Sequence, residues 1–410
     1  MRVLIVANNI SMRMGGEAVL PYHYVREMKE MGVDFHALAH ARVRDELKNS
    51  ELWEEGRFHF VEDAAIEKAV NRLGKLAPQA IRDRVFMSAI SAITGARLAR
   101  RARRLAAEKN IEIIHQPTPV SPKFPSFLTN MPAPVVIGPM NGGMSFPPAF
   151  EKDYAQGSTA AVGAARALSG LFNRLIPGKL KAARILVANE RTLAALPSVI
   201  DRSRAVLLQE NGVDLKIWEG APSQKPQAPV FVFVGRLIWL KGVDLLFEAF
   251  RQAPPAARLL VIGDGPERAR LEALAADPAF AGRIAFLGFK PQREIREILA
   301  GATALVLPSL HECGGAVILE AFACRTPAIA TDWGGPREYV TPETGILVAP
   351  DSRRAFIGGL AAAMTRLGSD RALAARLGEA AHAHVIANFS WRAKARQMLD
   401  IYKAAIEERR

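Results

Sequence analysis

The sequence is poor in cysteine and contains no long apolar run. Its only two cysteines, Cys313 and Cys324, cannot build a disulfide framework, which excludes a disulfide-stapled fold and favours a reducing cytoplasm. No stretch approaches the roughly 18 uninterrupted apolar residues that a membrane-spanning helix needs. The first apolar run turns polar at Asn8 and Asn9, which is too early for a signal peptide and indicates a buried first strand.

Aromatic residues are scarce where positive charge is densest. The formal net charge of +13 favours anionic partners, such as nucleic acid, phospholipid headgroups or phosphorylated small molecules. Residues 64–110 contain eleven Lys or Arg against three acids, yet Phe86 is their one aromatic residue. General nucleic-acid binders interleave aromatic side chains for base stacking, so no nucleic acid is expected as a partner. Residues 64–110 and 160–181 therefore have two interpretations: solvated helix faces, or a contact with an anionic membrane or a lipid-linked acceptor.

The chain of 410 residues is too long for one ordinary core, and its two halves begin alike. An apolar run over residues 3–7 precedes a Gly-Gly turn and a helical pattern over 17–31, and a run over 230–234 precedes a helical pattern over 243–251. Continuous apolar strands that alternate with amphipathic helices predict parallel sheets covered on both faces. Further strands are predicted at residues 111–114, 135–137, 185–188, 259–262, 284–287, 304–307 and 328–330. The polar, proline-containing segment 220–229 is the candidate linker.

A loop that carries two cations, residues 235–242, directly follows one of the predicted buried strands. Ligands of open parallel sheets bind beyond the carboxyl ends of the strands, so this loop lies where a ligand is expected. Arg236 and Lys241 place a guanidinium fork and a point charge five residues apart, which suits a diphosphate. The alternative is two surface cations in a loop.

A second strand, loop and helix span residues 305–324. Glu312 lies in the loop, and the helix is expected to start near Gly315, where its first turn offers unpaired amides to an anion or to sugar hydroxyls. Glu320 lies among apolar residues of that helix, where a carboxylate without a partner is costly. Vicinal ribose hydroxyls would supply two donors to it, and an internal backbone amide or arginine is the alternative.

Two signatures lead from these residues to a family. Glu312 and Glu320 form a Glu-x7-Glu pattern, and Gly235-Arg236-Leu237 is followed by Lys241-Gly242. In both patterns the sequence resembles the retaining glycosyltransferases of family 4. Further marks follow in the family's order at Gly15-Gly16, Glu210–Asp214, Gly263–Pro266, Phe286–Gly288, Thr326-Pro327 and Phe389–Trp391. The resemblance implies an α/β, GT-B fold in which two Rossmann-like, doubly wound parallel-sheet domains face each other across a cleft.

The resemblance also implies a division of the chain and of its tasks. An acceptor-side domain is expected over residues 1–205 and a nucleotide-sugar donor domain over residues 206–389, with a final helix over 390–410 that packs back on the first domain. The donor itself would be a nucleotide-diphosphate sugar, linked to UDP or GDP.

The roles in the donor domain are carried over from the family. Arg236 and Lys241 would hold the donor diphosphate, Glu320 the ribose, and Glu312 the transferred sugar. The amides of Gly314, Gly315 and Ala316 would meet the sugar hydroxyls and the distal phosphate, and the backbone near Gly288 and Phe289 the base. The donor-binding set is Gly235, Gly263, Gly288, Phe289, Gly314, Gly315, Ala316 and Glu320, and the catalytic set is Arg236, Lys241 and Glu312.

The acceptor-side loops depart from the common pattern of the family. Gly15 and Gly16 would let the first loop approach the sugar closely, since glycine has no side chain to obstruct it. The stretch from Gly138 to Gly143 resembles a subgroup with a Gly-Pro-x-x-Gly-Gly loop; it contains Asn141 but no histidine. His115, at the end of a predicted strand, is a candidate for the site or a structural histidine. Family members often have Glu-Gly-Phe-Gly where this chain has Glu312-Cys313-Gly314-Gly315, which changes the sugar pocket.

The expected reaction is transfer of a sugar with retention at its anomeric carbon. The acceptor would be a saccharide, a lipid-linked or a small molecule, in cell-envelope or exopolysaccharide biosynthesis. No Asp-x-Asp pair is present, so neither a metal nor a cofactor besides the donor is expected. The expected location is cytoplasmic, with peripheral contact to the inner face of the membrane. The alternatives are a degenerate nucleotide-sugar-binding or scaffold protein, and an epimerase or sugar-phosphate synthase of the same architecture.

Overall fold

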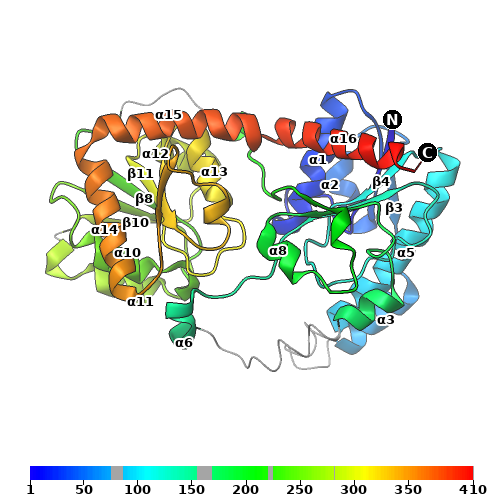
Figure 1. Cartoon of the computed structure of the whole chain (residues 1–410), viewed down its shortest axis with the longest axis horizontal. Coiled ribbons are helices and arrows are strands. Elements are labelled where there is room, and N and C mark those ends of the chain that lie inside the picture. Colours follow the sequence, from blue (N-terminus) through cyan, green and yellow to red (C-terminus); the bar gives the residue numbers. More distant parts are fainter. Residues whose placement is uncertain (75–85, 155–168, 220–224, 281, 410) are drawn as a thin grey trace. The chain divides into compact units, whose positions relative to one another are not determined.

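The computed structural model (Figure 1) describes residues 1–74, 86–154, 169–219, 225–280 and 282–409, which fall into two compact units. Among them, unit 1 comprises residues 1–74, 86–143, 169–210 and 395–409, and unit 2 comprises residues 144–154, 211–219, 225–280 and 282–394. The segment that begins at Met144 therefore belongs to unit 2, although the chain enters it from unit 1. Parts of the basic segments 64–110 and 160–181 and of the linker 220–229 lie outside the described residues.

Unit 1 is built on a parallel sheet of seven strands in the order β3-β2-β1-β4-β5-β6-β7. The strands are β1 (Arg2–Val6), β2 (Asp34–His40), β3 (Phe58–Val61), β4 (Ile113–Gln116), β5 (Val135–Met140), β6 (Arg184–Val187) and β7 (Ala205–Leu207). Its helices include α1 (Val19–Glu30), α2 (Arg44–Lys48), α3 (Ala65–Gly74), α5 (Met87–Glu108) and α8 (Glu190–Ala195), and α16 (Trp391–Glu407) ends in this unit. The apolar residues of β1 and β4 are buried because helices cover the sheet.

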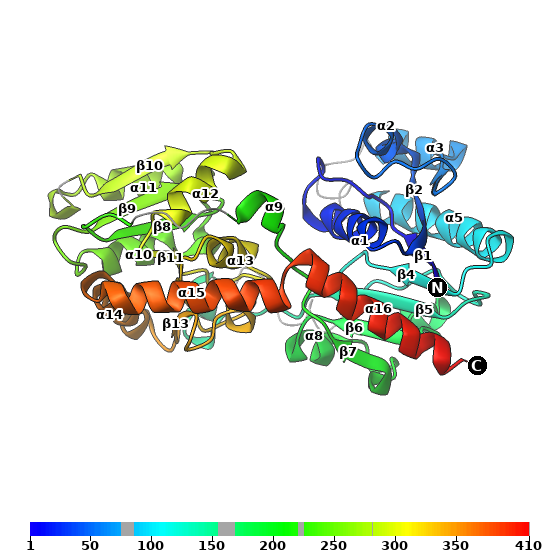
Figure 2. The same cartoon turned by 90° about the horizontal axis from the view of Figure 1, so that it is seen from above.

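Unit 2 repeats the plan with a parallel sheet of six strands in the order β10-β9-β8-β11-β12-β13. The strands are β8 (Val230–Val234), β9 (Arg258–Ile262), β10 (Ile284–Gly288), β11 (Ala304–Leu307), β12 (Ala328–Thr331) and β13 (Gly345–Val348). The helices are α6 (Glu151–Tyr154), α9 (Leu215–Trp218), α10 (Val243–Phe250), α11 (Arg268–Ala275), α12 (Gln292–Ala300), α13 (Ala316–Ala323), α14 (Arg353–Ser369) and α15 (Arg371–Asn388). In Figures 1 and 2 the long helix α15 runs beside α13, with which it packs.

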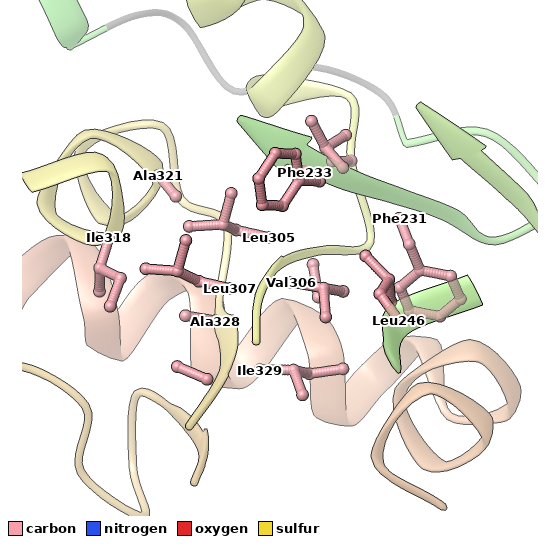
Figure 3. Close-up of a cluster of buried hydrophobic side chains, with 14 of the residues drawn as sticks. Phe231, Phe233, Leu246, Leu305, Val306, Leu307, Ile318, Ala321, Ala328 and Ile329 are labelled. Atoms are coloured by element: carbon pink, nitrogen blue, oxygen red, sulfur yellow. The ribbon is translucent and has the colours of Figure 1, made fainter. Parts of the chain in front are cut away.

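The core of unit 2 lies between its sheet and these helices. Figure 3 shows side chains of β8 and β11 beside two helices: Phe231 and Val306 lie near Leu246 of α10, and Leu307 lies near Ile318 of α13. All five are fully buried. Burial of a side chain of this size contributes about 1.5–3 kcal/mol, so the core fixes the positions at which the strands end and the loops begin.

The predicted parallel α/β architecture is confirmed. Each strand predicted from an apolar run is present, with ends shifted at some of them, and the helical patterns over 17–31 and 243–251 correspond to α1 and α10. The sequence did not predict β2, β3, β7 or β13. No helix of the described residues combines the length and the hydropathy needed to cross a bilayer.

The helix α5 shows how the described part of the basic segment 64–110 is oriented in unit 1. Leu98, Ala102 and Leu105 are buried, while Arg100, Arg103 and Arg104 are exposed. This spacing places the apolar stripe against β1, β2 and β3 and the arginines toward solvent. The arginines of α5 thus form an exposed basic face, which is compatible with both interpretations.

Candidate functional site

The strand order of unit 2 marks one edge of its sheet as a ligand site. From β8 the chain builds outward to β9 and β10, then returns to place β11 on the other side of β8. The loops that follow β8 and β11 therefore lie at the topological switch point of the sheet, where the strand order reverses and where ligands of doubly wound sheets bind. These are the loops that carry Arg236, Lys241 and Glu312.

The loop after β8 is held rigidly although it carries exposed charge. The amides of Gly235 and Leu237 donate to the carbonyls of Ile262 (3.0 Å) and Asp264 (2.9 Å), and Leu237 is fully buried. Gly242 adopts the left-handed conformation (φ 61°) at the start of α10, and a Cβ there would lie 2.5 Å from the carbonyl oxygen of Pro308. Only glycine fits this close approach of the loops after β8 and β11.

Two of the predicted catalytic residues touch. The Nζ of Lys241 donates to Oε2 of Glu312, and their side chains are 18% and 16% exposed. The pair joins the two loops across 71 positions of sequence. Arg236 is exposed, and no hydrogen bond or ion pair holds its guanidinium among the described residues. The positive charge of Arg236 is therefore fully available to a bound anion, whereas the charge of Lys241 is already paired with Glu312.

Glu320 lies in α13, one turn inside the helix. Burial raises the pKa of its carboxyl to about 7, and no hydrogen bond from another described residue opposes that rise. The internal arginine or amide partner considered from the sequence is not present among the described residues. A carboxylate without donors favours a ligand that brings hydroxyl groups to it.

The helix α13 begins at the loop that contains Glu312. Gly315 caps it in the left-handed conformation (φ 86°), and the amide of Ile318 donates back to the carbonyl of Gly315 (2.9 Å). The amides of Ala316 and Val317, at the very start of the helix, have no intrahelical acceptor. The loop after β12 supports this turn, because the amide of Gly335 donates to the carbonyl of Glu312 (2.8 Å). A Cβ on Gly335 would lie 2.2 Å from the carbonyl oxygen of Gly314, so the two backbones are in direct contact.

The loops after β9 and β10 complete this edge of the sheet. Gly263 has φ 130°, and a Cβ there would lie 2.0 Å from the carbonyl oxygen of Gly235. Gly288 also has positive φ (67°), and it directs the chain to Phe289, whose side chain is 84% exposed. An aromatic side chain this exposed offers an open π-face for a base.

The acceptor-side glycines lie in unit 1, beyond the end of β1. Gly15 and Gly16 both have positive φ, and a Cβ on either would meet nothing within 4 Å. Glu46 of α2 holds the preceding stretch, since its carboxylate accepts from the hydroxyl of Ser11 (2.5 Å) and from the amide of Met12 (2.9 Å). The first part of the loop is thus held by hydrogen bonds, whereas the space around its two glycines is free.

His115 is fully buried in β4, and both of its ring nitrogens are engaged. Its Nε2 lies 2.6 Å from the carbonyl oxygen of Gly138 and must donate to it, so Nδ1 accepts from the hydroxyl of Tyr402 in α16 (2.6 Å). Burial lowers the pKa of His115 to about 4, so the ring is neutral at pH 7. These bonds tie α16 to the sheet of unit 1, which is the structural interpretation considered from the sequence.

Asn141 follows β5 and is held by a residue that the sequence did not single out. Arg191 of α8 donates from Nη2 to Oδ1 of Asn141 (3.0 Å) and from Nε to the carbonyl of Gly142 (3.1 Å). Thr192 adds a bond to the amide of Gly142 (3.1 Å). The Gly-Pro-x-x-Gly-Gly loop is therefore fixed to α8.

The predicted donor-side residues all lie beyond the carboxyl ends of β8, β9, β10 and β11, within one unit. Among them, Lys241 and Glu312 are paired through their side chains, and the amide of Gly263 donates to the carbonyl of Gly288 (2.9 Å). Three aromatic side chains at the same edge were not predicted from the sequence: Phe146, Trp239 and Trp333. Trp239 was visible between the two cations, but Phe146 lies in the half of the sequence that builds unit 1.

The comparisons with known proteins match the part of the chain that contains these residues. Residues 217–384 match the family described as Glycosyl transferases group 1. The alpha-maltose-1-phosphate synthase of Mycolicibacterium smegmatis is 36% identical over 213 residues, 47% of this chain and 55% of the relative. The lipopolysaccharide core biosynthesis glycosyltransferase LpsE of Rhizobium meliloti is 35% identical over 164 residues, 40% of this chain and 46% of the relative. The chain thus spans about half the length of the curated relatives it matches.

Solved structures match over the whole chain. A glycosyltransferase from Rickettsia africae superposes with a TM-score of 0.65 at 18% identity, over 99% of this chain and 98% of that one. Anabaena HepE in complex with UDP superposes with a TM-score of 0.65 at 17% identity, over 98% of this chain and all of that one. At these identities the likeness shows the fold, which is GT-B.

The matched segment contains every predicted donor-side residue and none of Gly15, Gly16, His115 or Asn141. Residues 217–384 are therefore similar to the glycosyl transferases group 1 family, in a chain with the GT-B fold.

Proposed function

We propose that this protein is a retaining glycosyltransferase that takes a sugar from a UDP- or GDP-linked donor bound by unit 2. The observation that carries the proposal is the set of groups beyond the carboxyl ends of β8 and β11. Arg236 is unpaired among the described residues, and Lys241 is paired with Glu312. The amides at the start of α13 and the buried carboxyl of Glu320 complete the set. The family match of residues 217–384 supports the same donor class.

The charges of the site suit a diphosphate that departs from a sugar. Because Glu312 already neutralises Lys241, Arg236 supplies the net positive charge that attracts the donor. As the bond to the sugar breaks, charge develops on the diphosphate, and Lys241 shifts its hydrogen bonds from Glu312 toward it. Glu312 is then released toward the transferred sugar. A donor phosphate oxygen takes the acceptor proton on the same face, which gives retention without a strong protein base.

Glu320 would bind the ribose as a carboxylate. Two hydroxyl donors stabilise the charged form and lower its pKa, so nucleotide binding releases a proton from Glu320 near neutral pH. The affinity for the nucleotide should therefore rise with pH up to about 7, the pKa of the free carboxyl, and level off above it. Phe289 would stack on the base.

The acceptor is proposed from the relatives and the loops of unit 1. The similarity to a lipopolysaccharide core glycosyltransferase supports a saccharide or lipid-linked acceptor in cell-envelope or exopolysaccharide biosynthesis. The similarity to an alpha-maltose-1-phosphate synthase favours a second candidate, in which a sugar phosphate accepts the sugar. In either case residues 1–205 would bind the acceptor and residues 206–389 the donor. The loop from Gly138 to Gly143 would place the chain in the subgroup that has a Gly-Pro-x-x-Gly-Gly loop.

A peripheral membrane contact on the cytoplasmic side is proposed for unit 1. Phe172 and Leu175 are 50% and 69% exposed beside Arg174, in the described part of the second basic segment. Apolar side chains next to cations are typical of interfacial helices. The intact protein should sediment with liposomes that contain anionic lipid at low salt and remain in solution with neutral liposomes. Equal behaviour with both would contradict the contact.

The transfer itself is tested with a panel of UDP- and GDP-sugars, by following release of the nucleoside diphosphate with and without saccharide and sugar-phosphate acceptors. Lys241→Met should slow the release by about 10²–10³-fold, the usual effect of removing one donor to developing charge. Lys403→Met, which removes an exposed lysine of α16, is the control and should leave the rate unchanged. A scaffold protein would bind the donor and release nothing.

A further inference from the structure

The segment that follows β5 is anchored in unit 2. The ring of Phe150 is 1% exposed and meets Phe356 of α14 edge-on, with centroids 5.9 Å apart and planes at 78°. Phe150 belongs to the same buried cluster as the strands β8 and β11. The segment that leads into α6, teal in Figure 1, is thus part of the donor domain's core.

Just before this anchor, the chain crosses three loops at the edge of the sheet. The ring of Phe146 stacks on Trp239 in the loop after β8, with centroids 5.7 Å apart and planes at 14°. The same ring lies 5.0 Å from the ring of His311 in the loop after β11. The indole N–H of Trp333, in the loop after β12, donates to the carbonyl of Ser145 (2.9 Å).

These contacts lie next to the charged groups of the site. Trp239 stands between Arg236 and Lys241 in its loop, and His311 directly precedes Glu312. One side chain, Phe146, therefore contacts both loops that the Lys241–Glu312 pair joins. Packing of this kind fixes the position of one loop relative to the other, because aromatic stacking is directional.

We propose that Phe146 is a positioning residue of the donor site: by packing between Trp239 and His311 it holds Lys241 and Glu312 where the donor diphosphate and the transferred sugar will be. The inference rests on the proposed function, since it takes the ligand to be a nucleoside diphosphate. Displacement of a charged group by about 1 Å is enough to reduce its effect about a hundredfold. Phe146 acts through Lys241 and touches no part of the nucleoside.

Calorimetric titrations with nucleoside diphosphates and the matching nucleoside monophosphates, UDP with UMP and GDP with GMP, test this role without an acceptor. Phe146→Ala should weaken the diphosphate about tenfold, while the monophosphate, held through the ribose and the base, changes less than about threefold. Phe146→Tyr keeps the stacking ring and should restore the wild-type ratio. Leu274→Ala, which removes an exposed side chain of α11, is the matched control.

Each outcome decides the matter. If Phe146→Ala binds the diphosphate as the wild type does, or loses both nucleotides equally, Phe146 is a packing residue and the inference is overturned. If the wild type itself binds no nucleoside diphosphate, the proposed function fails and the inference fails with it. Should Phe146→Ala not fold, Phe146→Leu, which fills the space but cannot stack, replaces it with the same expected loss.

Discussion

Replacement of Glu320 by glutamine should make the protein more stable and worse at binding its nucleotide. The carboxyl has a pKa raised from 4.5 to about 7 because burial disfavours its charge. A shift of this size corresponds to about 3 kcal/mol, at about 1.36 kcal/mol for each pKa unit. Glutamine has nearly the same shape and no charge to bury, so Glu320→Gln should regain up to this amount.

The gain depends on pH in a defined direction. Below pH 4.5 the carboxyl is protonated in both the folded and the unfolded protein, so it costs nothing. Between pH 4.5 and about 7 the folded protein retains a proton that the unfolded chain has released, and the stability of the wild type falls as pH rises. Above pH 7 the cost is complete. The variant should therefore equal the wild type at acid pH and exceed it at alkaline pH.

Urea unfolding of both proteins across this pH range, followed by tryptophan fluorescence, measures the difference. The exposed carboxylate of Glu343 supplies the control, since Glu343→Gln should change stability by no more than about 0.5 kcal/mol at any pH. In the same samples, Glu320→Gln should bind UDP or GDP at least about tenfold more weakly, because charge-assisted bonds to ribose hydroxyls are lost. A variant that is no more stable at alkaline pH, or equally more stable at acid pH, would refute the reasoning.

Further predictions concern the loop geometry and the buried histidine. Gly263→Ala should destabilise unit 2 by at least about 2 kcal/mol in thermal or urea unfolding, because its Cβ would lie 2.0 Å from the carbonyl oxygen of Gly235. Gly358→Ala, at a helical position with open space, should instead stabilise by about 0.5–1 kcal/mol, and similar effects of the two alanines would contradict the steric argument. Tyr402→Phe should lower the free energy of unfolding of unit 1 by about 1–3 kcal/mol, because the buried Nδ1 of His115 loses its hydrogen-bond donor. An unchanged unfolding midpoint would show that water replaces the hydroxyl.

The parallel sheets could be predicted because their central strands are continuous apolar runs. β8 and β11 are buried on both faces, and such strands stand out from the helices between them. The strand β2 was missed because His36 and His40 interrupt its apolar pattern, although both are buried in the fold. The edge strands β7 and β13 have three and four residues, and apolar runs this short do not by themselves distinguish a strand from other structure.

The donor site could be predicted in its residue types but not in its contacts. The spacing of Arg236 and Lys241 after a strand indicated a diphosphate loop, since the position of such loops follows from the topology. The pairing of Lys241 with Glu312 depends on the adjacency of β8 and β11, which only the fold shows. The packing of Phe146 on Trp239 could not be foreseen, because the chain passes from one unit to the other between Gly143 and Met144.

The central claim is that Arg236 and the Lys241–Glu312 pair bind the diphosphate of a nucleotide. Calorimetric titration of the intact protein with UDP and GDP, at about pH 8 where Glu320 is ionised, tests it most directly. Either UDP or GDP should bind at a single site. Arg236→Gln should weaken the affinity for that diphosphate about tenfold or more, while the affinity for the corresponding nucleoside, uridine or guanosine, stays unchanged. Absence of heat with either nucleotide, or a diphosphate affinity that survives the loss of Arg236, would contradict the claim.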